Sequence, residues 1–329
     1  MQKIKRSLRS LGRNAKDCIG ILIGLGVMCV LLMLMTDKFL TGSNLFNIIR
    51  QITINIFLAC GMTLVILLGG IDLSVGSVIA VSGCFSAGMV TWMKLPVPLG
   101  IAIGLLCGVA IGSINGLIAS RTTIPPFIIT LATMNIGRGI ARLYTSAKTI
   151  AVLNPAYTFF GTGKIGEIPI QLLLIVLVVG VTSFILNRTK VGRGIYYVGD
   201  NEQAAKYAGL PVRKIRFFVF IFSGLLAGMA GILSTARTFA ATMDMGTSAE
   251  MDAIAAVILG GTSMSGGRGT LMGTVIGAVI IGVLNNGMNL LGINTSWQYV
   301  VQGVVILIAV YIDYLKNNGG LLKKFKQTK

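Results

Sequence analysis

The chain has 329 residues, of which 54% are hydrophobic and 12% charged, and 43 are glycine. This composition excludes an ordinary globular domain and is typical of a polytopic membrane protein. The net charge of +18 does not indicate a nucleic-acid partner, because the basic residues lie at the ends of apolar runs and in a few clusters.

Two residue types narrow the chemistry further. The chain contains no histidine, which excludes imidazole bases and histidine-ligated metal sites. The five cysteines each lie in or at the edge of an apolar run, without the clustering of a ligand set; they are Cys18, Cys29, Cys60, Cys84 and Cys107. We interpret them as packing residues, and we expect no metal, cofactor or catalytic residue in this chain.

The N-terminal end combines a basic segment with an apolar run. Six basic residues lie within residues 1–17, and residues 18–35 are apolar. The pattern can mimic a signal peptide, but no small-residue cleavage site follows Met35. A retained span with a cytoplasmic N-terminus is therefore predicted.

Nine further apolar runs follow, and each predicts a membrane-spanning helix. They cover residues 52–68, 73–92, 97–119, 126–143, 168–186, 217–236, 251–261, 270–291 and 297–314, the eighth span (251–261) being short. The predicted fold is an all-α, polytopic transmembrane helical bundle of about ten spans with both termini cytoplasmic. A single transmembrane domain would cover residues 18–315, between basic cytoplasmic tails at 1–17 and 316–329.

The distribution of charge agrees with this topology. Ten spans place 20 of the 28 lysines and arginines on the inner side, as the positive-inside rule expects. Trp92 and Trp297 then fall at the outer boundary, where amphipathic rings are enriched.

Polar residues interrupt the apolar sequence at 69–77, which holds Asp72 and Ser74 among three glycines. Non-helical backbone at membrane depth is tolerated only against protein or a water-filled path, and an intramembrane carboxylate is a functional candidate. Asp72 can instead cap a helix that begins at Leu73. A cap on a broken helix beside a pathway would satisfy both interpretations.

Glycines recur at every fourth residue in two of the predicted spans. They are Gly100, Gly104, Gly108, Gly112 and Gly116 in one span, and Gly269, Gly273 and Gly277 near another. Small residues at this period let two helices approach closely in lipid. The pattern predicts tight packing within the chain, with a contact between subunits as the alternative.

Neutral polar side chains inside the spans suit hydrogen bonding to an uncharged polyol. Those proposed to line a pathway together with Asp72 and Ser74 are Asn115, Thr133, Asn135, Asn285 and Asn289; Asn55, Thr130 and Asn286 share the pattern. Bonds between helices are an equally good explanation for any one of them. The remaining acids near the eighth span, Asp244, Glu250 and Asp252, suit an outer mouth, a receptor contact or a relay.

The segment 187–216 is the one long, basic, water-compatible interval between apolar runs. Its centre, 201–211, predicts a short helix: Asn201 can cap it, Glu202 lies in the first turn, and Gly209 followed by Pro211 ends it. Within this helix, Ala204, Ala205 and Ala208 form a small-residue face. A short helix that protrudes into the cytoplasm in this way is suited to docking into a cleft of a partner protein.

The glycine-rich stretch 261–270 is only faintly similar to a phosphate loop, because Arg268 stands in place of a displaced lysine and no strand precedes it. We therefore expect that any ATP-driven motor belongs to another polypeptide.

Three segments together resemble the membrane permeases of ribose-type ATP-binding-cassette sugar importers. They are residues 69–76, residues 125–139, and residues 194–211 with 255–270, and the similarity extends from about residue 39 to residue 317. The resemblance implies a permease domain in a bacterial cytoplasmic membrane, with two permease copies forming the pathway, a homodimer being favoured.

The resemblance also implies partners and a contact site. Cytoplasmic ATPase subunits would grip a coupling helix, and an extracytoplasmic binding protein would deliver the sugar. Residues 202–209 are similar to the family's degenerate EAA-like element, which implies that Glu202, Ala205 and Gly209 lie at the ATPase contact together with Asn201, Ala204 and Ala208. The cargo stays open between ribose, another pentose or hexose, and a related polyol-like signal. An ion-coupled secondary carrier is the alternative, although the acid-poor spans speak against it.

Overall fold

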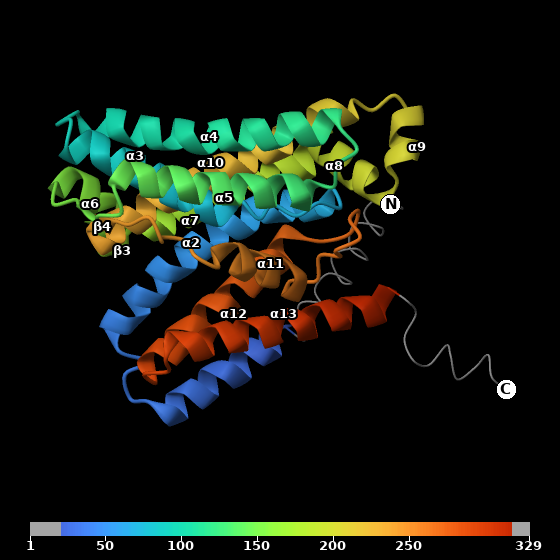
Figure 1. Cartoon of the computed structure of the whole chain (residues 1–329). Coiled ribbons are helices and arrows are strands. Elements are labelled where there is room, and N and C mark those ends of the chain that lie inside the picture. Colours follow the sequence, from blue (N-terminus) through green and yellow to red (C-terminus); the bar gives the residue numbers. More distant parts are fainter. Residues whose placement is uncertain (1–20, 318–329) are drawn as a thin grey trace.

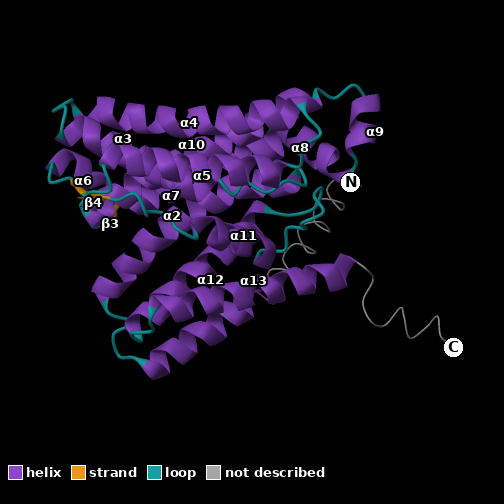
Figure 2. Cartoon of the chain, viewed as in Figure 1, coloured by secondary structure: helices purple, strands orange, loops and turns teal. Residues whose placement is uncertain are grey.

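The computed structural model describes residues 21–317 and consists of helices with four very short strands. Most of the chain lies in long apolar helices, as the composition predicts (Figures 1 and 2). The all-α fold class is therefore confirmed. The basic tail at 1–17 and most of the tail at 316–329, together with Cys18, lie outside the described residues.

Most of the helices follow the predicted runs to within a few residues, but the helix predicted at 52–68 begins at Gly42, ten residues earlier, because the more polar residues 43–51 continue it. After a first helix, Ile21–Met35, they are α2 (Gly42–Leu67), α3 (Val75–Thr91), α4 (Val97–Arg121), α5 (Pro126–Thr145), α6 (Pro155–Thr162), α7 (Ile170–Arg188), α8 (Lys190–Asp200), α9 (Glu202–Tyr207), α10 (Val212–Thr238), α11 (Ala249–Leu259), α12 (Leu271–Leu290) and α13 (Thr295–Asn317). The strands pair as β1 (Ile150–Ala151) with β4 (Ala240–Ala241), and β2 (Lys164–Ile165) with β3 (Ile168–Pro169).

Within the described residues, six helices are long and apolar enough to cross a membrane: α2, α4, α7, α10, α12 and α13. The helices Ile21–Met35 and α3 are also apolar but shorter. The structure thus supports a multi-pass membrane protein, while the count of about ten spans stays a prediction.

The helix α2 lies at the centre of the molecule (Figure 1) and packs against α7, α10, α11 and α12. Its side chains from Ile52 to Leu67 are buried or nearly so, and Phe57 and Leu64 are fully buried. The contact with α12 is antiparallel, because Asn44 bonds to Asn286 at one end and Thr63 bonds to Thr274 at the other. Polar pairs thus tie these helices together, as the interhelical interpretation of such residues expects.

The glycine repeat of α4 is an intramolecular seam. A Cβ at Gly108 or Gly112 would overlap the backbone of α10, and one at Gly104 would press against Ser82 of α3. In the second repeat, Gly273 and Gly277 lie as closely against α11. The prediction of tight packing within the chain is confirmed, because only glycine leaves room for these backbones to meet.

The two ends of the bundle differ. The helices α8 and α9 lie at one end, and α6 with the short strands lies at the other (Figure 1). Here and below, the first is called the α9 end. It also carries the C-terminal ends of α2 and α4 and the start of α10.

Candidate functional site

The predicted short helix at 201–211 is present as α9, and its boundaries follow from its residues. The Asn201 side chain accepts a hydrogen bond from the Ala204 amide at 2.9 Å, which caps the first turn. Gly209 has a φ of 77°, the left-handed conformation that ends a helix most readily at glycine. The prediction of this helix, its cap and its end is confirmed.

Two features of the segment 187–216 differ from the prediction. Residues 190–200 form the additional helix α8, which Thr189 caps by accepting a bond from the Gly192 amide at 3.0 Å. The helix α10 begins at Val212 rather than at Phe217, so the last basic residues of the segment belong to a long helix. Charged side chains at the end of an apolar helix explain this extension, since they can reach water while the backbone stays helical.

The helix α9 presents different surfaces on its sides. Ala205 is buried, whereas the Tyr207 side chain is 90% exposed and projects away from the protein. A groove of about 350 Å³ lies along α9 and is lined by Tyr197, Asp200, Asn201, Ala204, Ala205, Ala208 and Leu210. The predicted small-residue face of Ala204, Ala205 and Ala208 therefore lies in this groove, together with the exposed Tyr197.

Glu202 ties α9 to the bundle. Its carboxylate bonds to Lys206 at 2.7 Å and to Arg216 of α10 at 2.7 Å. Arg216 also donates to the carbonyl oxygen of Ala119, in the last turn of α4, at 3.1 Å. Partial burial acts to raise the pKa of Glu202, but the bonds and charges of Lys206 and Arg216 outweigh it and hold that pKa below its ordinary value.

A second tie joins α8 to the end of α2. A Cβ at Gly199 would overlap the carbonyl oxygen of Leu67, so glycine is required for this close approach. The same carbonyl accepts a bond from the Gly267 amide at 2.9 Å. Three segments that are far apart in the sequence therefore meet at the α9 end.

The polar residues at the break between α2 and α3 form one buried network. The Asp72 carboxylate accepts bonds from the Ser74 amide at 3.0 Å, the Ser74 hydroxyl at 2.6 Å and the Ser223 hydroxyl at 2.8 Å. Asn115 donates to Ser74 at 2.9 Å and accepts from Thr133 at 2.7 Å. Four of the seven predicted pathway residues, Asp72, Ser74, Asn115 and Thr133, thus lie together, buried and joined by hydrogen bonds.

This arrangement refines the interpretation of Asp72. The helix α3 begins at Val75 rather than at Leu73, so Asp72 lies in the turn before the helix. Its bonds hold this turn against α10 instead of capping a first turn that starts at Leu73. Ser223, which completes the network, carries no distinguishing signal in the sequence beyond being a hydroxyl in an apolar run.

Two helices connect the Glu202 contacts with the Asp72 network. On α4, Ala119 lies four residues after Asn115, which is about one turn. On α10, Ser223 lies seven residues after Arg216, which is about two turns. The Glu202 contacts and the Asp72 network are therefore separated by about one turn of α4 and two turns of α10.

The other three predicted pathway residues lie elsewhere. The Asn135 side chain is exposed on α5 and bonds to the Leu131 carbonyl of its own helix. Asn285 donates to Asp252 at 2.9 Å, and Asn289 accepts from Gln298 at 2.9 Å. The structure therefore does not gather all seven residues into one place.

The acids near α11 have separate surroundings. Glu250 is buried in the first turn of α11, while Asp244 lies in the preceding loop. Arg138 donates to the carbonyl oxygens of Met243 and Met245 in that loop. Within residues 21–317 no three acidic, cysteine or histidine residues lie close enough together to hold a metal ion.

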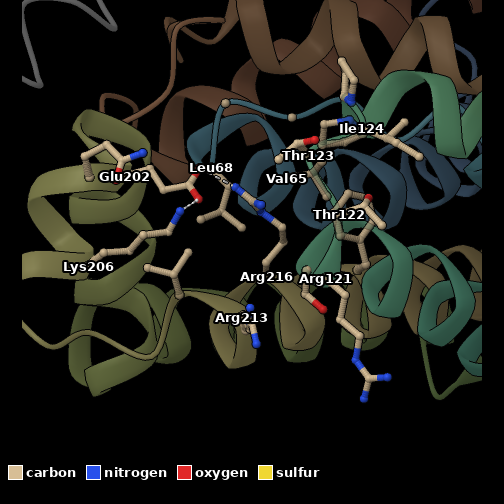
Figure 3. A pocket seen from close by; sticks show the side chains of 18 residues that line it. Val65, Leu68, Arg121, Thr122, Thr123, Ile124, Glu202, Lys206, Arg213 and Arg216 are labelled. Carbon is tan, nitrogen blue, oxygen red and sulfur yellow. Dashed lines mark hydrogen bonds and ion pairs between the residues drawn. The ribbon is translucent and has the colours of Figure 1, made fainter.

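A polar cavity of about 510 Å³ lies at the α9 end, between α9, the start of α10 and the loop from α4 to α5 (Figure 3). It reaches Gly69 and Gly70 at the end of α2, two residues from Asp72. Its charged lining residues are Arg121, Glu202, Lys206, Arg213 and Arg216.

Comparisons with known proteins find relatives over most of the chain. Residues 44–310 match a family model described as the permease component of a branched-chain amino acid transport system. The ribose import permease protein of Bacillus subtilis is 44% identical over 91% of this chain and 93% of its own length. That of Escherichia coli K12 is 41% identical over 90% of this chain and 93% of its own, and the D-allose transport system permease protein of the same strain is 38% identical over 85% and 86%.

Proposed function

The chain belongs to this family of transport-system permease components, and from that premise we propose that it is the membrane-spanning subunit of an ATP-binding-cassette importer for a monosaccharide. The similarity to ribose-type permeases is thereby confirmed. The observation that carries the cargo class is the near-full-length identity to permeases named for ribose and D-allose. Ribose or a related pentose or hexose is the proposed cargo.

The proposed partners follow from the same membership. ATP hydrolysis is assigned to a separate cytoplasmic ATPase, and delivery of the sugar to an extracytoplasmic binding protein. The permease itself then breaks no covalent bond. We place it in the inner membrane of a bacterium with about ten spans, both termini in the cytoplasm, and a second permease copy, favouring a homodimer.

The α9 surface is the proposed ATPase contact. It combines the exposed Tyr207, the groove beside Ala204 and Ala208, and a helix whose ends are set by Asn201 and Gly209. Closing of the ATPase dimer would push on α9, and the Glu202 and Arg216 contacts would pass that movement to α10 and α4. Free-energy coupling requires this surface to contact the ATPase states differently.

The pathway proposal now has two parts. Asp72, Ser74, Asn115 and Thr133 satisfy one another in this conformation, so we propose that they act as a unit that opens toward the solute when α4 and α10 shift. Contact of the solute with Asn135, Asn285 and Asn289 is supported only by their polar side chains within apolar helices.

Reconstitution tests this function. Proteoliposomes that contain the permease, its ATPase and its binding protein should accumulate radiolabelled ribose, allose or xylose in an ATP-dependent manner, and omission of the ATPase should abolish accumulation. Uphill uptake by the permease alone would instead indicate a secondary carrier. ATP-dependent uptake of a branched-chain amino acid, with none of a sugar, would contradict the cargo class.

A further inference from the structure

The cavity at the α9 end has an excess of positive charge. Four cationic side chains line it, Arg121, Lys206, Arg213 and Arg216, with the single carboxylate of Glu202. Glu202 is shared by Lys206 and Arg216. The side chains of Arg121 and Arg213 form no hydrogen bond or ion pair with the described part of the chain. The guanidinium groups of Arg121 and Arg213 therefore have no opposite charge beside them within the described residues. Lys206 and Arg216 share the Glu202 carboxylate, which offsets only one of their two positive charges.

The positions of these groups favour an anionic ligand. Arg216 extends toward Glu202 and Lys206, whereas the Arg213 and Arg121 side chains point away from that group (Figure 3). Both still line the cavity, from the start of α10 and the end of α4. Clustered like charges repel one another, and an anion placed among them offsets that repulsion. A volume of about 510 Å³ is large enough for a phosphate and the group it carries.

Exposed apolar surface also lies at this cavity. Ile124 lines it and is 44% exposed. Phe127, which follows the lining residue Pro126 in the chain, is 47% exposed. A soluble phosphate would use the cations but leave these side chains uncovered. A ligand with both a phosphate and hydrocarbon chains would use both surfaces.

We propose that this cavity binds the headgroup of an anionic phospholipid. The phosphodiester would accept bonds from Arg121 and Arg213, whose planar forks match phosphate oxygens, and the acyl chains would lie along Ile124 and Phe127. Basic pockets between membrane helices recognise such headgroups. Because Glu202 and Lys206 of α9 line the same cavity, the bound lipid holds α9 at a set distance from α4 and α10. This site is independent of the cargo and requires only that the chain spans a membrane.

Thermal unfolding in nanodiscs tests the proposal. The unsubstituted chain is compared in phosphatidylcholine alone and in an equal mixture of phosphatidylcholine and phosphatidylglycerol, together with the double variant Arg121→Gln/Arg213→Gln. Lys214→Gln is the matched control, because Lys214 neighbours Arg213 and is exposed but does not line the cavity.

Phosphatidylglycerol should raise the melting temperature of the unsubstituted chain and of Lys214→Gln, and the double variant should lose most of this shift. In native mass spectrometry the double variant should retain phosphatidylglycerol roughly 30-fold more weakly, the effect of two basic residues at a membrane surface. Native mass spectrometry measures retained lipid directly, so it still tests the site if the double variant is too unstable for the melting assay.

Three results would overturn the proposal. An equal shift in the double variant and in Lys214→Gln would leave only a general surface-charge effect. Stabilisation by millimolar inorganic phosphate in phosphatidylcholine, lost in the double variant, would assign the cavity to a soluble phosphate. Stabilisation that appears only when the ATPase is added would assign it to an acidic segment of that partner.

Discussion

At the scale of single residues, the α9 end depends on a few polar contacts between distant parts of the chain. Glu202 receives cations from its own helix and from α10, and Arg216 shares its guanidinium between Glu202 and the end of α4. Asp72 accepts three bonds while almost fully buried, so each of its donors matters. The Glu202 contacts lie near the surface and the Asp72 contacts in the core. We therefore expect loss of a donor to Asp72 to lower stability more than substitution of Glu202 does.

Glu202→Gln should lower stability by about 1 kcal/mol or less, because Glu202 is partly open to solvent, which screens its ion pairs. The folded pKa of Glu202 lies below its ordinary value, so the stabilisation is complete above the ordinary carboxyl pKa of about 4.3. It is lost as the pH falls through the folded pKa. The difference in melting temperature between the two proteins should therefore be constant from neutral pH to about pH 5.5 and vanish at lower pH. A difference that grows on acidification would contradict this assignment.

Ser223→Ala should destabilise the protein by about 1–3 kcal/mol, because one oxygen of the buried Asp72 carboxylate loses its donor. Ser113→Ala is the control, since the Ser113 hydroxyl donates only to Val109 of its own helix. Chemical or thermal unfolding in detergent measures both. Equal effects of the two substitutions would show that the bond to Asp72 adds nothing beyond a local contact.

Gly209→Val should uncouple ATP hydrolysis from uptake in the complete transporter. A β-branched residue at a φ of 77° costs about 1–2 kcal/mol, so the end of α9 should shift although no atom blocks the new side chain. Gly209→Asn is the control, because asparagine tolerates the left-handed conformation. Hydrolysis and uptake are measured at equal amounts of permease in the membrane. Normal uptake in Gly209→Val would remove the support for α9 as a lever.

At the scale of elements, the seam between α4 and α10 sets how the α9 end connects to the Asp72 network. Gly108, Gly112 and Gly116 bring the backbones of α4 and α10 into contact over about two turns, so this part of the pair can move as one body. The four-residue period was visible in the sequence, but its partner helix was not. A small-residue face can pack closely against any of several helices, so the sequence alone does not identify its partner.

Gly112→Ala should destabilise the protein by about 1–3 kcal/mol, because the added methyl group would overlap the Phe220 carbonyl and force the helices apart. Gly180→Ala on α7 is the matched control, since a Cβ there meets nothing within 4 Å. This substitution should be neutral or stabilise by up to about 1 kcal/mol through helix propensity. Unfolding in detergent compares the two. Tolerance of Gly112→Ala equal to that of Gly180→Ala would exclude a tight seam.

At the scale of the whole molecule, the two ends of the bundle have different surface features. The α9 end holds the groove, the exposed Tyr207 and the cationic cavity, whereas the opposite end holds α6 and the short strand pairs (Figure 1). Under the proposed function, in which α9 contacts a cytoplasmic ATPase, we expect the α9 end to face the cytoplasm.

Cysteine labelling tests this orientation. Tyr207→Cys should react with a membrane-impermeant maleimide in inside-out vesicles and not in intact spheroplasts, because this side chain projects from the α9 end. Leu153→Cys, which is exposed in the loop before α6 at the opposite end, should show the reverse pattern. The unsubstituted chain supplies the background from native cysteines. Labelling of Tyr207→Cys in spheroplasts would invert the proposed topology.

The sequence by itself determined the features that depend on neighbouring residues. Apolar runs predicted most of the long helices to within a few residues, although α2 and α10 begin earlier, in polar sequence. Asn201 and Gly209 predicted the boundaries of α9, because caps and helix ends act over one turn. Its motifs also predicted the family, which the comparisons confirm.

Only the tertiary structure decided which of the predicted residues meet. Asp72 bonds to Ser223, 151 residues away, and Arg216 to Ala119, 97 residues away, while Asn135 lies on an exposed surface. Local pattern does not encode such pairs, because any polar group in an apolar helix seeks a partner and the packing of the whole bundle selects which one it finds.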